Sequence, residues 1–495
     1  MTLKGSRPVK DVIVVGGGLG GLSAAWRLRH WDTALLESGS RVGGRIRSER
    51  RGAYWLNWGG HVFAGPGTST DALLNEAGIT AAQIPGSLTG LAMNGKLMLS
   101  GRVETYPFRI PMPMSSRIAL IKAGIKVRRQ VLRYAGVTRQ RPGEDPSARQ
   151  QRIYDFENGR SFRDFTGDLP EDAEALFRPT VTRSAAEPHE MSAGAGIGYF
   201  SLVWNIGQGL NRGILGGPST LTEGIAAALG DRVRLGAEVT EIVHKQGSVV
   251  VRYRQAGVDR EAEARYAVLA TPATVSHRIA VDLPQDIREA LGKVVYGPYV
   301  SAAFLTNETT PQPWDDAYAI ATPKRSFNIA LNQSSLIRGS EPARQPGSSI
   351  MVFSPANLAR ALLAKSDDEI LRIYTDDLNQ VLGPCFGGSV TEAQVQRFPT
   401  GAAYCFPGRG ALQPALMRRG SRVLLAGDYL GTLYTETAIQ TGFSAAQEVL
   451  SLLATDRQRA LPAGHQLTSS LTTSKETTDD SATPRSADGA RHSVH

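Results

Sequence analysis

The fold is decided near the N-terminus by the stretch Val12-Ile13-Val14-Val15-Gly16-Gly17-Gly18-Leu19-Gly20-Gly21. Its first four residues form an apolar run typical of a buried strand, and the glycines that follow are typical of a tight turn. Residues 22–28 continue with a helical pattern, and Thr33-Ala34-Leu35-Leu36-Glu37 forms a second apolar run that ends in an acid. Strand, glycine turn, helix and strand in this order predict a βαβ unit.

The glycine turn has the spacing of a dinucleotide-binding fingerprint. In such a unit Gly16 permits the turn, Gly18 lets the backbone approach a diphosphate, and Gly21 allows helix and strand to pack closely. The diphosphate binds at the helix N-terminus, where unpaired N–H groups attract an anion. Glu37 is placed to accept hydrogen bonds from ribose hydroxyls, which argues against NADP at this site. The alternative is a glycine turn without a ligand, which the strand, helix and acid together disfavour.

The next segment, Glu37-Ser38-Gly39-Ser40-Arg41-Val42-Gly43-Gly44-Arg45, resembles the second flavin motif of the amine oxidase superfamily. This superfamily also includes relatives of protoporphyrinogen oxidase and phytoene desaturase. The paired glycines let the backbone pass near the cofactor, and Arg41 and Arg45 can neutralise phosphate charge. The similarity continues in residues 56–63, 73–79, 216–221 and 235–239, and then in Ala426-Gly427-Asp428-Tyr429. As a set in chain order, these matches indicate FAD.

The resemblance also implies how the flavin is held. Val239 would contact the adenine, Asp428 would bind the ribityl or pyrophosphate region, and a helix from about Thr437 to Leu453 would point its N-terminus at the flavin N1/O2 edge. We expect noncovalent FAD, because the flavin-attaching cysteine of monoamine oxidases has no match near residues 401–403. The implied cofactor-binding residues are Gly16, Gly18, Leu19, Gly20, Gly21, Glu37, Ser38, Arg41, Gly44, Arg45, Gly59, Gly60, His61, Val239, Thr271, Gly427, Asp428, Thr437 and Ala438.

The order of strand and helix patterns predicts an α/β protein with a discontinuous Rossmann-type, GR2-like FAD-binding domain. Apolar runs at residues 232–254, 267–270 and 423–426 return strands to that domain late in the chain. We assign residues 1–79, 215–285 and 396–455 to it. An interleaved α+β substrate domain takes residues 80–214 and 286–395. Residues 456–495 are poor in apolar side chains and are predicted to be a disordered tail.

Three residues are candidates for catalysis. The resemblance implies that a hydride passes from a C–N or C–C bond of a small organic substrate to the flavin N5, and that O2 or another acceptor reoxidises the flavin. Tyr434 aligns with an aromatic residue that monoamine oxidases place beside the flavin, and Tyr404 is a second candidate wall; such rings attract an amine through cation–π contact. His61 is a candidate acid or base, because histidine titrates near neutral pH. Each of the three could instead be a structural residue.

The strand expected around residues 299–304 lacks the lysine that many amine oxidases carry there, where it bonds a water near N5. Amine oxidation and desaturase-like oxidation therefore both stay open. Two other classes are alternatives: a non-redox flavoenzyme resembling UDP-galactopyranose mutase, and a protein that retains FAD without turnover. Substrate specificity resides in the second domain, which has no transferable motif, so the sequence predicts neither the substrate, the electron acceptor nor the oligomeric state.

The net charge of +9 is concentrated in one segment, residues 117–141, which has eight basic residues and no acid. Ile118, Ile121, Ile125 and Leu132 recur there at helical spacing, on one face beneath a basic one. Such a helix can lie on an anionic membrane, or it can be a solvated surface helix packed on its own domain. Nucleic-acid binding is not expected, because the segment has one aromatic residue and no recognised motif.

The remaining composition narrows the class of protein. Apolar runs are too short to cross a bilayer, and the N-terminus lacks the plan of a signal peptide, so we expect a cytoplasmic protein, with peripheral membrane contact as the alternative. The two cysteines, Cys385 and Cys405, form no CxxC pair, and the histidines do not cluster. Neither a disulfide scaffold nor a metal site is therefore expected.

Overall fold

The glycine turn lies at the carboxyl end of a central strand in the first of two large sheets. The structure is a computed structural model that describes residues 9–84, 90–204, 210–338, 344–432 and 434–460. The predicted βαβ unit is confirmed as β1 (Lys10–Val15), α1 (Leu19–Arg27) and β2 (Thr33–Leu36). β1 pairs in parallel with β2 and with β13 (Val258–Leu269), as expected of a crossover unit. The α/β class is therefore confirmed.

The first sheet has seven strands, and its apolar residues form one core cluster with the helices that cover it. Three strands form an antiparallel meander, which leads the chain back to the parallel centre. The strand order is β10 (Val233–Arg234), β2, β1, β13, β12 (Ser248–Gln255) and β11 (Ala237–Lys245), with β19 (Val423–Leu425) paired to β13.

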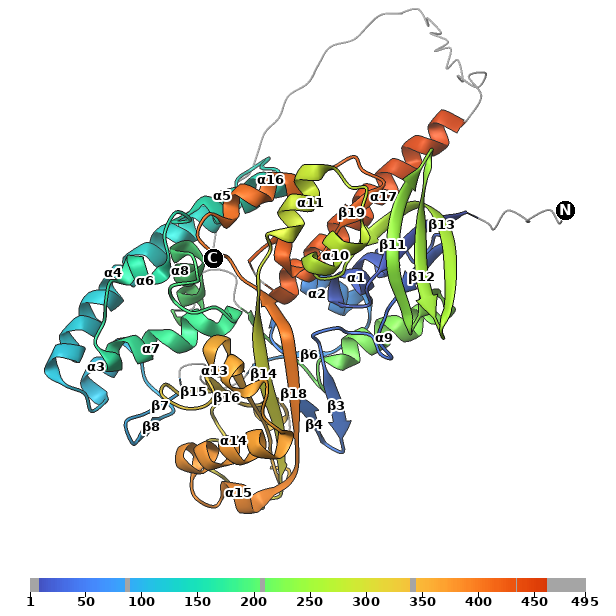
Figure 1. The fold of residues 1–495 in the computed structure, drawn as a ribbon. Helices are drawn as coiled ribbons and strands as arrows, with labels where there is room; N and C mark the ends of the chain where they lie inside the picture. The colour runs from blue at the N-terminus through green and yellow to red at the C-terminus, as the bar shows by residue number, and fades with distance from the viewer. Residues whose placement is uncertain (1–8, 85–89, 205–209, 339–343, 433, 461–495) are drawn as a thin grey trace, which may run out of the picture. The chain divides into compact units, whose positions relative to one another are not determined.

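The second large sheet forms a wall of the interior beside the first. Figure 1 shows its two longest strands, β14 (Tyr296–Thr306) and β18 (Val390–Ala403), running side by side between the first sheet and a group of helices. The strand order is β18, β14, β17 (Ser349–Pro355), β16 (Ile329–Asn332), β15 (Ala319–Ala321), β7 (Gly90–Met93) and β8 (Lys96–Met98).

Helices from the middle of the chain form a separate apolar cluster around Phe162, Phe165 and Ile197. Figure 1 shows them gathered at the end of the molecule away from the meander. These helices are α4 (Met114–Thr138), α5 (Pro146–Asp155), α6 (Phe162–Thr166), α7 (Glu171–Val181) and α8 (Ala193–Val203), and the turn η2 (Thr182–Ser184) follows α7. The short helix α3 (Tyr106–Arg109) precedes α4 and contacts it.

Shorter elements complete the fold. Two small sheets pair β3 (Ser48–Arg51) with β4 (Tyr54–Asn57), and β9 (Leu210–Ile214) with β5 (Phe63–Ala64) and β6 (Ala81–Gln83). The other helices are α2 (Ser69–Glu76), α9 (Ser219–Leu229), α10 (Ala273–Ile279), α11 (Gln285–Gly292), α12 (Ser335–Arg338), α13 (Ala356–Leu362), α14 (Asp367–Leu382), α15 (Phe386–Ser389), α16 (Gln413–Leu416) and α17 (Tyr434–Ala460).

The basic segment 117–141 forms the expected helix, but its apolar stripe does not pack on the protein. Ile118, Ile125 and Leu132 are 47%, 50% and 58% exposed. A second stripe, which includes Val127 and Val131, faces the core instead. α4 therefore packs on its own domain through the second stripe, and Ile118, Ile125 and Leu132 of the first stripe stay exposed.

The predicted domain borders fall inside regular elements at two places. β18 crosses the border between residues 395 and 396 and pairs with β14 along its length, so residues 396–403 continue the second sheet. α17 begins three residues before the predicted Thr437 and continues to Ala460, so residues 456–460 are helical and not part of a disordered tail. Residues 461–495 of that predicted tail lie outside the described residues.

Both large sheets belong to one compact unit that ends at Leu452, and Leu453 begins a second unit. The division into cofactor and substrate domains stays a prediction. None of the described helices combines the length and apolar character needed to cross a bilayer.

Candidate active site

A cavity of about 1520 Å³ extends from the glycine turn to the α4–α8 helices and is walled by the second sheet. It brings together residues from both ends of the chain. Gly21 and Arg41 are absent from its described lining. The predicted cofactor residues that do line it are Gly16, Gly18, Leu19, Gly20, Glu37, Ser38, Gly44, Arg45, Gly59, Gly60, His61, Val239, Thr271, Gly427, Asp428, Thr437 and Ala438.

The glycine turn leaves room for a diphosphate. Gly16 has a φ of 100°, and a Cβ on it would lie 2.9 Å from the carbonyl oxygen of Ala270, so the tight turn requires glycine. A Cβ on Gly18 would meet no protein atom within 4 Å, because Gly18 faces the open space of the cavity. No side chain caps α1 at Gly18, so the first amides of the helix are available to an anion.

Gly21 has a packing function. A Cβ there would lie 1.9 Å from the carbonyl oxygen of Gly16, so any larger residue would push α1 away from β1. Close packing of helix on strand is the function expected of the third glycine in a dinucleotide-binding fingerprint.

Glu37 is fixed at the carboxyl end of β2 by backbone amides. Its Oε2 accepts a hydrogen bond from the Gly17 N–H at 2.6 Å, and its Oε1 accepts one from the Gly39 N–H at 2.7 Å. Each carboxylate oxygen keeps acceptor capacity on the cavity side, which suits a ribose.

Arg41 does not face the cavity as predicted. Its guanidinium donates to the carbonyl oxygens of Val42, Ile46 and Gly44 at 2.9, 3.1 and 2.7 Å. In this structure the side chain braces the loop that carries Gly44 and Arg45, and its phosphate-neutralising role stays a prediction. Burial and the nearby charge of Arg47 lower the pKa of Arg41, and the charge of Glu37 opposes this shift.

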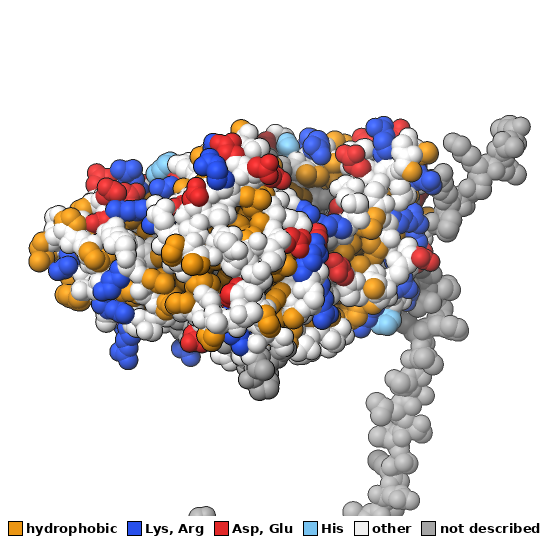
Figure 2. All heavy atoms as spheres, turned by 90° about the horizontal axis from the view of Figure 1, so that it is seen from below, with side chains coloured by type: hydrophobic (Ala, Val, Ile, Leu, Met, Phe, Trp, Pro, Cys, Tyr) orange, Lys and Arg blue, Asp and Glu red, His pale blue; other side chains and the backbone are white. Residues whose placement is uncertain are grey.

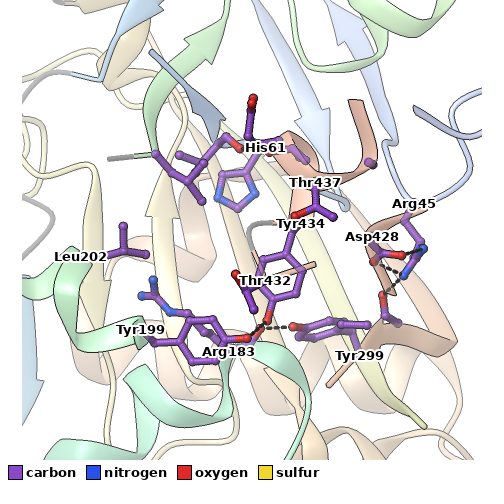
Figure 3. Close-up of a pocket in the computed structure, with 18 of the residues that line it drawn as sticks. Arg45, His61, Arg183, Tyr199, Leu202, Tyr299, Asp428, Thr432, Tyr434 and Thr437 are labelled. Carbon is purple, nitrogen blue, oxygen red and sulfur yellow. Dashed lines mark hydrogen bonds and ion pairs between the residues drawn. The ribbon is translucent and has the colours of Figure 1, made fainter. Parts of the chain in front are cut away.

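Arg45 joins the second flavin motif to the C-terminal motif. Its Nη1 and Nη2 donate to the two carboxylate oxygens of Asp428 at 2.9 and 2.8 Å, and Nη1 also donates to the Gly401 carbonyl oxygen at 3.1 Å. Burial opposes the charge of Arg45, but attraction and hydrogen bonding to Asp428, together with the phenols of Tyr296 and Tyr299, outweigh it and raise the pKa of Arg45. This bidentate pair closes the cavity wall where the two ends of the chain meet, and Figure 3 shows it at the edge of the site.

His61 lies where the lining passes from the cofactor residues to the tyrosines. Its Nδ1 is 3.0 Å from the Gly59 carbonyl oxygen, which can only accept, so Nδ1 carries the proton and Nε2 has the free lone pair. Burial, opposed by this hydrogen bond and reinforced by the charge of Arg183, lowers the pKa of His61 to about 4. The ring is therefore neutral at physiological pH.

Tyr434 faces a second tyrosine that the sequence did not single out, Tyr199 of α8. Their rings are stacked 6.1 Å apart at 7° and their hydroxyl oxygens are 2.6 Å apart, as drawn in Figure 3. Burial raises the pKa of both phenols, so both are neutral. A group between two ring faces needs ~7 Å or more, since each contact takes about 3.5 Å, so the rings here act as one wall.

The backbone of Tyr434 is strained. Its φ of 33° lies in the left-handed region that favours glycine. Strained residues persist where the surrounding structure holds them, and they cluster at functional sites. The strain places the Tyr434 ring against Tyr199 at the start of α17.

Tyr404 does not line the cavity. It follows the end of β18, is partly buried, and packs against the apolar cluster of the α4–α8 helices. Its predicted role as a wall of the site is therefore wrong, and Tyr199 provides the second ring. The two cysteines are also absent from the described lining.

The strand β14 presents Tyr299 and Ser301 to the cavity, where many amine oxidases have a lysine. Ser301 Oγ donates to the Trp58 carbonyl oxygen at 2.8 Å. The described lining contains no lysine. Within the described residues no group of acids, histidines and cysteines could hold a metal ion.

Comparisons with known proteins agree with this lining. The profile of the flavin containing amine oxidoreductase family matches residues 19–450. The flavin-containing amine oxidase A of Bos taurus is 27% identical over 481 residues, which covers 90% of this chain and 85% of that protein. The flavin-containing amine oxidase of Danio rerio is 26% identical over 483 residues, covering 89% and 85%.

Solved structures share the fold. Putrescine oxidase bound to putrescine has a TM-score of 0.69 at 18% identity and covers 90% of this chain and 99% of that one. Cyclohexylamine oxidase from Brevibacterium oxydans has the same TM-score and identity, covering 90% and 100%. These likenesses support the Rossmann-type flavin fold and do not favour the mutase alternative. The chain therefore belongs to the flavin-containing amine oxidoreductase family and is an FAD-dependent oxidoreductase.

Proposed function

We propose that this protein oxidises the carbon–nitrogen bond of a small amine, using FAD held noncovalently along the glycine turn. The observation that carries the proposal is the continuity of one cavity from the uncapped α1 N-terminus to the neutral His61 and the Tyr199–Tyr434 wall. The amine-oxidising relatives named above support the choice of a C–N bond.

The proposal divides the lining between two tasks. Residues of the segments 1–79, 215–285 and 396–455 hold the cofactor, except that His61 and Tyr434 also face the substrate, and those of 80–214 and 286–395 surround the substrate. When bound, the flavin supplies a hydride acceptor. Thr437 and Ala438, near the N-terminus of α17, line the cavity, and the positive end of the helix dipole would favour negative charge on a bound flavin.

His61 does not act as the general base in this proposal. An alkylammonium group has a pKa near that of lysine, ~10, so transferring its proton to a group with a pKa of about 4 would cost roughly 8 kcal/mol. We infer instead that the amine binds as the neutral base, since burial that disfavours a charged imidazole also disfavours an ammonium ion. His61 Nε2 then accepts an N–H hydrogen bond and orients the amine.

Anaerobic mixing of the holoenzyme with a panel of primary amines tests the proposal. The flavin absorbance should bleach, an aldehyde and ammonia should appear, and readmitted air should restore the colour with formation of peroxide. The rate of bleaching should rise with pH up to the pKa of the free amine, because only the neutral form reacts. A panel that leaves the flavin oxidised at every pH would refute amine oxidation.

Oxidation of a carbon–carbon bond is the second candidate. Two observations favour it: the described lining has no lysine, and the cavity continues past Tyr199 into an apolar region at Phe108, Ile121 and Ile125. An apolar polyene or porphyrinogen should then bleach the flavin when amines do not.

The noncovalent attachment has a separate test. The proposal is supported by the positions of Cys385 and Cys405, neither of which lines the cavity. Acid precipitation of the holoenzyme should release all flavin absorbance into the supernatant. A yellow pellet would show a covalent bond.

A further inference from the structure

The substrate part of the cavity contains an arginine, Arg183, whose presence the flavin site does not explain. Arg183 belongs to η2, directly after α7, and its side chain lines the cavity. The Tyr299 hydroxyl donates to its backbone carbonyl oxygen and fixes the turn against β14. The guanidinium is thus held by a rigid element and not by a long flexible loop.

The Arg183 side chain has no carboxylate partner among the described residues, and its Nε is buried without a hydrogen-bond acceptor. Burial lowers the pKa of Arg183, and the groups that oppose this are the phenols of Tyr434, Tyr199 and Tyr299. Buried guanidinium groups normally pair with an anion, since an unpaired buried charge is costly. The missing partner points to a ligand.

The middle segment of the chain contributes more bases than acids to the cavity lining. Between residues 103 and 204 the cavity lining includes four arginines and a single acid, Glu104. Glu104 accepts a hydrogen bond from the Trp204 indole at 3.2 Å, on the exposed side. Arg149 donates to the Thr138 carbonyl oxygen through Nε and Nη2 at 2.9 and 2.6 Å. The field in this part of the cavity therefore favours an anion.

Arg183 is also close to the reacting end of the cavity. Its charge acts on His61, and the phenols that act on Arg183 belong to the tyrosine wall. In Figure 3 the guanidinium points into the space between His61 and Tyr199, toward Leu202. A group bound to Arg183 is thus within a small-molecule length of the position that His61 orients.

We infer that Arg183 binds a carboxylate of the substrate, so that the substrate is an amine that also carries an acid group. This inference rests on the proposed amine oxidation for the amine and on the Arg183 geometry for the carboxylate. One hydroxyl proton of the Tyr199–Tyr434 pair is used in the bond between them, and the other hydroxyl can donate to the carboxylate. A guanidinium suits this task because its planar donors bind both carboxylate oxygens.

Binding of a carboxylate without an amine tests Arg183 independently of turnover. Benzoate should perturb the visible flavin spectrum of the holoenzyme in a saturable titration, and uncharged benzamide should bind much more weakly. Arg183→Gln should weaken benzoate binding about 10- to 100-fold, as expected for loss of a charge-assisted pair. Arg183→Lys should lose less, since it keeps the charge and loses the fork.

The matched control is Arg372→Gln. Arg372 is an exposed arginine of α14 that pairs with Asp376, outside the cavity lining. Its substitution should leave benzoate binding unchanged. Flavin content and the melting temperature of each variant check that Arg183→Gln retains the holoenzyme fold. Equal benzoate affinity in wild type and Arg183→Gln would overturn the inference.

Turnover then separates this inference from the proposed function. Phenylalanine should bleach the flavin of the wild type faster than phenethylamine, and Arg183→Gln should remove that preference. If benzoate binds through Arg183 but no amine bleaches the flavin, amine oxidation is refuted and the anion site stands. If phenethylamine reacts as well as phenylalanine in both proteins, the anion site is refuted and amine oxidation stands.

A different observation concerns the outer surface of α3 and α4. In the described chain, five large apolar side chains here are exposed, including Phe108 at 70% and Met114 at 61%. The others are Ile118, Ile125 and Leu132, which recur every seven residues on one face of α4. Figure 2 shows hydrophobic and basic side chains gathered at the end of the molecule where Figure 1 places these helices.

This surface is basic as well as apolar. α4 contains no acid, and Lys122, Arg128, Arg129 and Arg133 are exposed on it. We also propose that the α3–α4 surface, defined by these nine residues, docks on an anionic lipid membrane. Apolar side chains would enter the headgroup region, and the basic side chains would pair with lipid phosphates.

The cavity reaches the same surface. Phe108, Ile125 and Arg128 are at once exposed and part of the cavity lining. The α3–α4 surface therefore surrounds an opening of the substrate cavity. Docking there would let an amphiphilic substrate pass between the lipid surface and the cavity without crossing bulk water.

Flotation of the full-length holoenzyme with lipid vesicles tests the docking proposal. The protein should float with phosphatidylcholine vesicles that contain about a third phosphatidylglycerol and should stay behind with pure phosphatidylcholine. High salt should weaken binding, because it screens the basic residues. The triple variant Ile118→Ser, Ile125→Ser and Leu132→Ser should lose about tenfold or more in vesicle affinity.

Val258→Ser is the matched control, since Val258 is 54% exposed on the distant β12–β13 hairpin and should not contribute. Wild-type protein that ignores anionic vesicles would overturn the proposal. Sedimentation gives the other contrary outcome: if the wild type is a dimer and the triple variant a monomer, the α3–α4 surface covers a second copy of the chain instead of lipid.

Discussion

Replacing Asp428 by asparagine removes the carboxylate that joins the two ends of the chain while keeping the size of the side chain. The side chain of Asp428 is 10% exposed and that of its partner Arg45 is 34% exposed. Breaking a fully buried ion pair costs ~3–5 kcal/mol and losing an exposed pair costs ~0–1 kcal/mol. The intermediate exposure of Arg45 places the expected loss of stability at about 2 kcal/mol.

This loss translates into a small change in melting temperature. A chain with about 450 ordered residues unfolds with an entropy of roughly 1 kcal/mol per kelvin, so Asp428→Asn should lower the melting temperature of the apoprotein by only ~2 °C. The loss of FAD affinity should be easier to detect than this change in melting temperature, because Arg45 and Asp428 both line the cavity. We expect FAD to bind about tenfold or more weakly, measured by quenching of flavin fluorescence on titration.

Asp376→Asn is the control, because Asp376 pairs with Arg372 on an exposed face of α14, where an ion pair contributes little. It should change neither the melting temperature nor the FAD affinity. If Asp428→Asn binds FAD as tightly as the wild type, the Arg45–Asp428 pair has no part in the cofactor site.

Three further predictions follow from the cavity lining. Gly18→Val should fold with an unchanged melting temperature but bind FAD poorly, since its side chain fills open space in the cavity; Gly21→Ala should instead destabilise the protein, because its Cβ would lie 1.9 Å from the Gly16 oxygen. Equal loss of stability in both would contradict this distinction. Tyr199→Phe removes the hydroxyl contact with Tyr434 and should cost ~0.5–1.5 kcal/mol in chemical unfolding, and no change would mean that the bond does not form. His61 has a folded pKa of about 4, below its ordinary value near 6.5, so the unfolded chain takes up its proton first and stability should fall as pH drops from 6.5 to 4. His61→Asn should flatten that part of the stability profile, and an unchanged slope would exclude His61 as its source.

The cofactor half of the site could be predicted largely from the sequence, because its residues act through local geometry. The requirement for glycine at Gly16 and Gly21 comes from contacts with neighbouring strands, and the acid Glu37 sits at a fixed place after β2. Asp428 was found through its motif although it lies 383 residues from Arg45. The direction of the Arg41 side chain was not predictable, because the motif fixes the position of an arginine but not the orientation of its flexible side chain.

The substrate half could not be predicted in the same way. Tyr199 and Arg183 stand in segments without a motif, and they meet His61 only because α8 and η2 pack beside the second sheet. Tyr404 was a second candidate wall on the sequence, but it lies outside the cavity lining. The α4 helix was correctly predicted, but its two apolar stripes have the same spacing, so periodicity alone could not decide which faces inward.

The salt bridge between Arg45 and Asp428 also bears on how the protein is made. A ribosome synthesises the first flavin motif hundreds of residues before it reaches the acid that completes the wall. The cofactor site of a nascent chain is therefore incomplete for most of its synthesis. The entropic cost of bringing Arg45 and Asp428 together arises only when synthesis is nearly finished. We therefore expect FAD to bind with full affinity only after the chain has been synthesised beyond Asp428.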